Sequence, residues 1–400
     1  MGKNNKAVLA LSYAILVILL NNMMCSNKPS GSSVVASPYP LELGISFPPL
    51  DSVGNRNLAL PYLQELKIKT VRLAENWKFR QANSIDPLDF SGLKDKLDYL
   101  KNNGINIFLT IQSHAAAWAC TSDNQTGCIF NDLNKYKIYL KALFKFLKDN
   151  AYPVIAIQFG NEWQSTYWYP GTASDFIQAN NITYDEAKLI FPTIPFVLGG
   201  FSINSLRNLA ANNGNINSFY NDDATGKVDL YCKASAVICN GPFVELSTFL
   251  SSSSSIAYIN RVNTIINGSK FDQADIHLYD DVENWAAYHK TVKDLIGTRD
   301  IIVTEFGGPW LDCAKTVPDC TTMEPAEPQQ TYTLDYQATR LGQYISTINS
   351  LGVKTAYFFT LVDNELLPSP MHRKSGVLTY NASLVKISKK PSFSVLRSYR

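Results

Sequence analysis

Two glutamates in this chain have the positions that acid–base chemistry requires. Glu162 follows the apolar segment Val154–Phe159, and Glu305 ends a second such segment, Ile301–Glu305. A facing pair of carboxylates can cleave a glycosidic bond, because one protonates the leaving oxygen while the other attacks the anomeric carbon or activates water. The sequence contains no His/Cys/Asp set with metal-ligand spacing and no Gly-x-Ser-x-Gly segment. We therefore predict carboxylate chemistry without a metal or another cofactor.

Further polar and aromatic residues lie at the ends of short apolar segments or just after them. The polar ones are Arg72, His114, Asn161, His277 and Tyr279. Five of the six tryptophans share this placement: Trp77, Trp118, Trp163, Trp168 and Trp310. A single tryptophan in a connection is more often a lid on the core, but five in such positions favour stacking on sugar rings.

The elements that must hold these residues alternate between strands and helices. The predicted strands are Leu41–Phe47, Thr70–Leu73, Asn106–Ile111, Val154–Phe159, Phe196–Gly199, Ala274–Leu278, Ile301–Glu305 and Thr355–Thr360. The predicted helices are Leu93–Asn102, Leu133–Asp149, Ile256–Ile266, Val282–Ile296 and Leu334–Ser350. Almost wholly apolar strands are typical of parallel strands buried on both faces, and Gly104 and Gly352 sit where helix C-caps are expected.

Eight strands alternating with helices predict the α/β class and a single (β/α)8 TIM barrel with long insertions after its strands. The alternative is an open doubly wound sheet, which is disfavoured because no Gly-x-Gly-x-x-Gly or phosphate loop follows the first strand. The longest insertions are Gly200 to Asp272 and Pro309 to Tyr332. In a barrel, these connections lie at the strand C-termini, where active sites are built.

The motifs resemble those of a retaining glycoside hydrolase of the large (β/α)8 superfamily, closest to the cellulase and mannanase-type family 5, over residues 40–400. The resemblance implies that Asn161-Glu162 supplies the acid/base and a 2-hydroxyl ligand, and that Glu305 is the nucleophile. It also implies that Arg72, His114 and His277-Leu278-Tyr279 line the substrate site. From their positions after strands, we expect Trp163 and Trp310 to be aromatic contacts for the sugar. Lys390-Pro391-Ser392-Phe393 resembles the start of the family's last helix.

The last strand departs from the family pattern. The family places a Trp at the end of this strand, whereas this chain has Phe358-Phe359-Thr360, with Asp363 nearby. Phe359 is the candidate replacement, and Asp363 is a candidate ligand for a sugar hydroxyl. A second Asn-Glu pair, Asn364-Glu365, is expected to be a loop pair.

Several alternatives remain open. Arg72 could orient Glu305 or form a core ion pair, and each histidine could support a neighbour instead of touching sugar. The chain could also be a non-catalytic carbohydrate-binding surface protein. A transglycosylase would use the same residues. The sequence identifies no particular sugar.

The cysteines predict disulfides. Six of the seven form three close pairs, Cys120-Cys128, Cys232-Cys239 and Cys313-Cys320, and local spacing favours this pairing among fifteen. A zinc site is disfavoured because no Cys-x-x-Cys or nearby His accompanies them.

The N-terminus predicts export. Lys3 and Lys6 precede the apolar run Ala7 to Leu20, so residues 1–25 fit an export signal, 26–38 a flexible tether and 39–400 the catalytic domain. An uncleaved anchor helix is the alternative, and Cys25 is either lipidated or removed with the signal. Without residues 1–25 the chain has 34 basic and 34 acidic residues, which predicts no nucleic-acid partner. We expect a monomer that is secreted or attached to the cell envelope.

Overall fold

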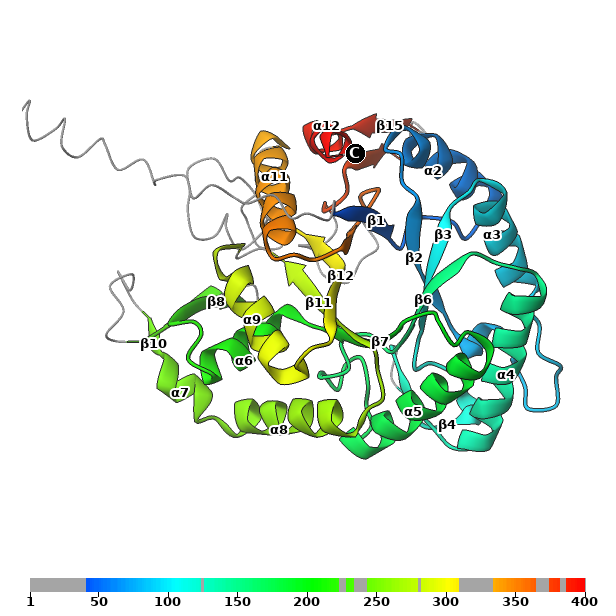
Figure 1. The fold of residues 1–400 in the computed structure, drawn as a ribbon, viewed down its shortest axis with the longest axis horizontal. Coiled ribbons are helices and arrows are strands. Elements are labelled where there is room, and N and C mark those ends of the chain that lie inside the picture. Colours follow the sequence, from blue (N-terminus) through cyan, green and yellow to red (C-terminus); the bar gives the residue numbers. More distant parts are fainter. Residues whose placement is uncertain are drawn as a thin grey trace, which may run out of the picture. The chain divides into compact units, whose positions relative to one another are not determined.

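The computed structural model describes residues 41–123, 126–222, 228–233, 243–279, 282–308, 334–364, 374–381 and 386–399. Eight parallel strands close into a barrel in the order β1-β13-β12-β11-β7-β6-β3-β2, and Figure 1 shows helices surrounding them. These strands are β1 (Glu42–Ser46), β2 (Thr70–Glu75), β3 (Asn106–Ile111), β6 (Val154–Phe159), β7 (Phe196–Phe201), β11 (Gln273–Tyr279), β12 (Asp300–Gly307) and β13 (Thr355–Phe358). The predicted (β/α)8 barrel and all eight of its strands are confirmed.

The outer layer contains helices that the sequence predicted and others that it did not. The predicted ones are α3 (Ser91–Asn102), α4 (Leu133–Asp149), α8 (Ser253–Gly268), α9 (Trp285–Ile296) and α11 (Leu334–Ser350). The others are α2 (Val53–Glu65), α5 (Ala173–Ile190), α6 (Ile203–Asn212), the short α7 (Leu246–Leu250) and α12 (Pro391–Ser398), and the Lys-Pro motif predicted only the start of α12. Short 3-10 turns are η1 (Trp77–Phe79), η2 (Ala117–Ala119) and η3 (Val282–Asn284).

Small sheets occupy the connections. They are the hairpin β4 (Cys120–Asp123) with β5 (Cys128–Phe130), the three-stranded sheet of β8 (Ser218–Asp222), β9 (Val228–Cys232) and β10 (Val244–Glu245), and the hairpin β14 (Leu378–Asn381) with β15 (Lys386–Lys389). The three-stranded sheet belongs to the long insertion between β7 and β11, which Figure 1 shows at one side of the barrel together with α6, α7 and α8.

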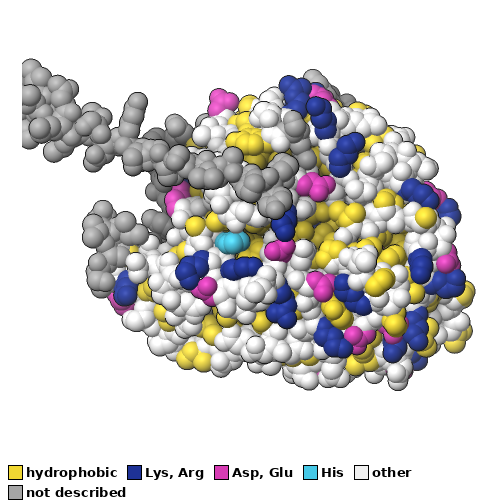
Figure 2. All heavy atoms as spheres, in the orientation of Figure 1, with side chains coloured by type: hydrophobic (Ala, Val, Ile, Leu, Met, Phe, Trp, Pro, Cys, Tyr) yellow, Lys and Arg dark blue, Asp and Glu magenta, His cyan; other side chains and the backbone are white. Residues whose placement is uncertain are grey.

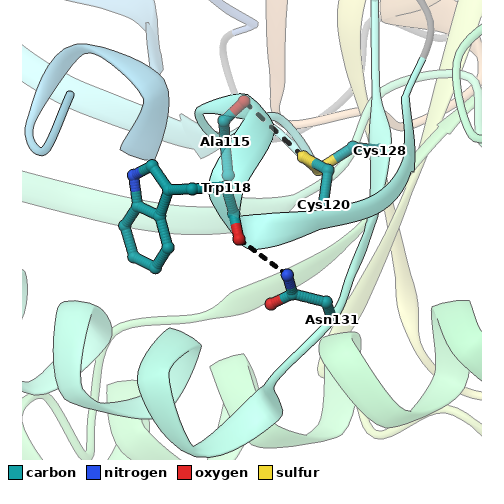
Figure 3. The surroundings of a disulfide bond; sticks show 5 residues. All are labelled: Ala115, Trp118, Cys120, Cys128 and Asn131. Carbon is teal, nitrogen blue, oxygen red and sulfur yellow. Dashed lines mark hydrogen bonds between the residues drawn. A yellow bond between two sulfur atoms is a disulfide. The ribbon is translucent and has the colours of Figure 1, made fainter. Parts of the chain in front are cut away.

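The hairpin of β4 and β5 contains a disulfide. Cys120 and Cys128 are bonded with a Cα–Cα distance of 5.7 Å, as the sequence predicted. Figure 3 shows the bond beside Ala115, with Asn131 donating to the Trp118 carbonyl oxygen at 2.7 Å. Cys232 is also disulfide-bonded. Its predicted partner Cys239 and the predicted pair Cys313-Cys320 lie outside the described residues.

The surface shows charges of both signs. On the face in Figure 2, Lys and Arg side chains lie among Asp and Glu side chains without a continuous patch of either sign. Within the described part of the chain, we find no helix with the length and hydropathy of a membrane span. The predicted export signal, tether and Cys25 lie outside the described residues.

Candidate active site

The structure brings Glu162 and Glu305 together at the carboxyl ends of the barrel strands. Glu305 lies on β12, and Glu162 follows β6 by three residues. Carboxylate oxygens of the two residues and a ring nitrogen of His277 all lie within 4.8 Å of one another. The Glu162 side chain is 19% exposed and that of Glu305 is 8% exposed, so both still reach solvent.

Glu305 is held by two donors. Arg72 Nη1 donates to Glu305 Oε1 at 2.5 Å, and the Tyr279 hydroxyl donates to Oε2 at 2.5 Å. Burial alone would raise the pKa of Glu305, but the positive charges of His277 and Arg72 and the two hydrogen bonds together lower it. The carboxylate is therefore anionic at neutral pH, as attack on an electrophilic carbon requires.

Arg72 is the centre of a buried polar network beneath Glu305. Its side chain is fully buried on β2. Its other hydrogen bonds go to Thr110 Oγ1, Gln158 Oε1, Asn161 Oδ1 and Ser46 Oγ. A buried guanidinium with every side of its fork occupied has little freedom to turn, so the network fixes the position of Glu305. This geometry fits both roles that the sequence left open, because Arg72 forms a buried ion pair with Glu305 and also holds its carboxylate in place.

His277 connects the two carboxylates. Its Nδ1 lies 2.8 Å from Glu162 Oε1, and its Nε2 lies 3.2 Å from Asp275 Oδ2 and 3.7 Å from Glu305 Oε1. Burial by itself would lower the pKa of His277, but the charges of Glu305 and Asp275 and the hydrogen bonds to Asp275 and Glu162 raise it to about 10. The imidazole is therefore protonated at neutral pH and donates from both ring nitrogens.

Glu162 occupies a strained turn. Its φ is +41°, a left-handed conformation that is uncommon for residues other than glycine. Gly160 just before it has φ +73°, and Trp163 just after it is fully buried, with its indole nitrogen donating to the Gly199 carbonyl oxygen at 2.7 Å. The buried tryptophan anchors the turn, and the strain is of the kind that is stored at functional sites.

Gly200 on β7 makes room for His277. A Cβ atom at Gly200 would lie 2.1 Å from His277 Nε2, far closer than real contacts allow. The imidazole ring therefore packs against bare backbone on this side.

The other predicted residues have different surroundings. Asn161 is 6% exposed, and His114 is half-buried. Trp163 has no exposed surface, so a sugar contact for Trp163 is not supported, because its ring packs between Phe176 and Phe201. Trp310 lies outside the described residues.

Phe359 and Asp363, which the sequence suggested in place of the family's tryptophan, have different surroundings. The Phe359 ring lies 6.1 Å from the Tyr279 ring, edge to face, and so close to Glu305. Asp363 forms an ion pair with the buried Lys390 at 2.8 Å and accepts from Gly376 N. Asp363 therefore has a structural role in the last connection.

Sequence reasoning missed four residues of the network. Thr110, Gln158, Asp275 and Thr304 lie fully buried within the barrel. Gln158 Nε2 and the Thr304 backbone N–H both donate to the Asp275 carboxylate, at 2.7 and 2.8 Å. Asp275 precedes His277 by two residues on β11, and period-2 alternation places both on one face of the strand. Gln158 is the one polar residue of β6, and Thr110 is the one polar residue in the buried part of β3, after Asn106 at its start. Such positions are a signal that could have identified both.

Glu162, His277 and Glu305 form a group of potential metal ligands among the described residues. Arg72 Nη1 already pairs with Glu305 Oε1, and both ring nitrogens of His277 already contact carboxylate oxygens of Glu162 and Asp275. The arrangement therefore fits proton transfer and nucleophilic attack better than metal binding.

Neither protein-family models nor curated protein sequences match the chain. Solved structures do. A family 39 glycoside hydrolase from Bacteroides cellulosilyticus WH2 matches with TM-score 0.56 and 13% identity, covering 90% of this chain and 63% of that one. The exo-β-1,4-mannosidase Op5Man5 from Opitutaceae bacterium strain TAV5 matches with TM-score 0.53 and 13% identity, covering 92% and 60%.

A family 1 β-glucosidase from Thermotoga maritima matches with TM-score 0.56 and 13% identity, covering 91% of this chain and 98% of that one. The chain shares its barrel fold with glycoside hydrolases. It spans less than two thirds of the length of the first two enzymes. The neighbours come from more than one glycoside hydrolase family, and none of these likenesses assigns the chain to family 5.

Proposed function

We propose that the chain is a retaining glycoside hydrolase that acts on β-linked carbohydrate, with Glu305 as nucleophile and Glu162 as acid/base. The observation that carries this proposal is the separation of the two glutamates. Retaining enzymes hold their carboxyl groups about 5 to 5.5 Å apart, whereas inverting enzymes need about 6.5 to 9.5 Å to admit a water. One carboxylate oxygen of each residue lies within 4.8 Å of the other, so both groups can act on the same glycosidic bond, and the retaining course is the part of the proposal that the first-released anomer tests.

The reaction would proceed in two displacements. Glu305 attacks the anomeric carbon and forms a glycosyl-enzyme ester, while Glu162 gives its proton to the leaving oxygen. Glu162, now a carboxylate that accepts a hydrogen bond from His277, takes a proton from water. The water oxygen bonds to the anomeric carbon and Glu305 departs. Asn161 Oδ1 accepts from Arg72, so Asn161 Nδ2 can donate to the sugar hydroxyl beside the anomeric carbon.

We also propose that the protein is exported. The basic and apolar start of the chain and the disulfide of Cys120 with Cys128 support this, because disulfides persist in oxidising compartments. Attachment through a lipidated Cys25 belongs to the same proposal.

The proposed reaction is tested with a panel of aryl β-glycosides and β-glucan and mannan polymers. We expect hydrolysis of at least one substrate, with the β-anomer as the first product by NMR. Glu305→Gln should reduce turnover to background because no glycosyl-enzyme can form. Glu283→Gln is the matched control, since Glu283 is 62% exposed and pairs with Arg340 outside the site. An α-anomer as first product, or full turnover by Glu305→Gln, would contradict the proposal. A sugar acceptor that replaces water would give transfer products in the same assay.

A further inference from the structure

A groove of about 1180 Å³ lies beside the proposed catalytic residues. Its walls come from the segments that follow β1, β2 and β13 and from α2, α3 and β15. Three phenylalanines, Phe47, Phe79 and Phe359, line it together with Asn55 and Asn76. Its volume exceeds the range of about 300 to 1,000 Å³ that is typical of pockets for one small ligand.

The groove begins one side chain away from Glu305. The Phe47 ring lies 4.7 Å from Arg72 Cζ, and Arg72 donates to Glu305. The Phe359 ring lies beside Tyr279, which donates to the same carboxylate. A ligand in the groove could therefore continue directly into the site.

The groove lies on the side away from Glu162. In the closed order of the barrel, β6, which carries Glu162 at its end, stands opposite β13, which carries Phe359 at its end. The leaving group departs from the oxygen that Glu162 protonates. The groove is therefore placed to hold the part of a substrate that stays bonded to Glu305 after the first displacement.

The groove walls carry balanced charge. Lys96 pairs with Asp51, Arg80 pairs with the buried Glu75, and Asp363 pairs with Lys390. The remaining wall combines the three aromatic rings and several aliphatic side chains with the side-chain amides of Asn55, Asn76 and Asn364. Aromatic faces beside amides suit the apolar faces and hydroxyl rims of uncharged sugars.

Backbone strain occurs both in the groove and at the proposed catalytic site. Four non-glycine residues in the described part of the chain have positive φ, and two of them, Lys67 and Ala151, stand just past the ends of helices. The other two are Glu162 and Phe47, with φ +41° and +46°. A left-handed conformation is a true outlier for a bulky residue, and such outliers cluster where a ligand is held.

We infer that this groove binds additional sugar units on the non-reducing side of the cleaved bond, and that the substrate is an uncharged oligo- or polysaccharide. The inference rests on the proposed glycosidase function and names the substrate class of that site.

The test compares kcat/KM for aryl β-glycosides of one, two and three sugar units, in a gluco series and a manno series. We expect kcat/KM to rise severalfold with length in one series, because remote binding energy is used at the reacting centre. Phe79→Ala, at a side chain that is 67% exposed, should lower the trisaccharide-to-monosaccharide ratio about two- to tenfold. The matched control is Phe243→Ala, since Phe243 is exposed and outside the groove, and it should leave the ratio unchanged.

Three results would overturn the inference: equal kcat/KM at every length, equal loss at every length in Phe79→Ala, or competition by an alkyl detergent and not by oligosaccharide. If no glycoside is turned over, the proposed function fails. Calorimetric titration with the underivatised trisaccharides and hexasaccharides then tests separately whether the groove binds sugar. Binding that Phe79→Ala weakens supports it, and absence of binding refutes it.

Discussion

At the scale of single residues, Glu162 and Glu305 have different surroundings and so suit different tasks. Glu305 accepts from Arg72 and Tyr279 deep in the site, whereas Glu162 is more exposed and contacts His277. A nucleophile must stay ionised throughout, while an acid/base must gain and lose a proton in each cycle. The hydrogen bonds to Glu305 suit the first requirement, and the greater exposure of Glu162 leaves it accessible to water, as the proposed roles need.

This difference predicts the behaviour of Glu162→Ala. Substrates with good leaving groups, such as dinitrophenyl glycosides, need little protonation, so their first displacement should be largely retained. Unactivated glycosides should lose about 10²- to 10⁴-fold in kcat/KM, the usual contribution of general acid catalysis. Azide should restore part of the turnover, because this anion attacks the glycosyl-enzyme without a general base.

Steady-state and single-turnover kinetics with and without azide provide the measurement, and Glu305→Ala, which azide should not rescue by the same route, is the comparison. Equal, near-wild-type cleavage of activated and unactivated glycosides by Glu162→Ala would remove Glu162 from the acid/base role.

The sequence could predict the outer members of the site and not its floor. Glu162, Glu305 and His277 stand out because costly polar groups lie at the carboxyl ends of apolar strands or just after them. Gln158 and Thr110 lie inside those strands, and their role depends on hydrogen bonds with Arg72 of β2 and with each other. These contacts join residues that are distant in the sequence, so the sequence alone does not reveal them. For Trp163 the sequence predicted a sugar contact, but the ring is buried in the core. Its position in the sequence does not distinguish a ring that touches a ligand from one that fills the core.

At the scale of elements, the strands were predictable and several helices were not. The barrel strands are apolar on both faces, a pattern that does not depend on partners. Helix α5 has no continuous apolar stripe, because Asn180, Thr183 and Glu186 are among its buried residues. Helix α2 contains Pro61 and buries Arg56, which weakens the same signal.

The start of α5 predicts a local stability effect. Thr172 and Asp175 form a capping box, in which each side chain accepts from the other residue's backbone N–H. Thr172→Ala should lower the free energy of unfolding by about 1 kcal/mol, measured by urea denaturation. Ser174→Ala is the control in the same turn, since Ser174 is exposed and should change stability little. An equal loss in both variants would show that the cap contributes nothing specific.

At the scale of the whole molecule, the buried charges should make stability depend on pH. The pKa of Glu305 is lowered from 4.5, so its contribution is present above about pH 4.5 and is lost as the pH falls through its folded value. The pKa of His277 is raised from 6.5 to about 10, so its contribution is complete below pH 6.5 and is lost as the pH rises toward 10. Both contributions are present together between these limits.

We therefore expect the free energy of unfolding to fall between about pH 6.5 and 10 in the wild-type chain. His277→Gln should be less stable at pH 6 and should show a flatter profile over that window, because its side chain does not titrate. Urea denaturation at several pH values measures both curves. Parallel curves for the two proteins would show that His277 is not the group responsible.

The close approach of Gly200 to His277 has a consequence for recognising related sites. A search pattern made only of carboxylates, histidines and arginines would accept a chain with alanine at position 200, although its Cβ would collide with the imidazole that contacts Glu162. The absence of a side chain at Gly200 is therefore a requirement of the site, because it leaves the space that His277 occupies. Screening of uncharacterised barrels for this arrangement should therefore require a glycine on β7 as strictly as it requires the two glutamates.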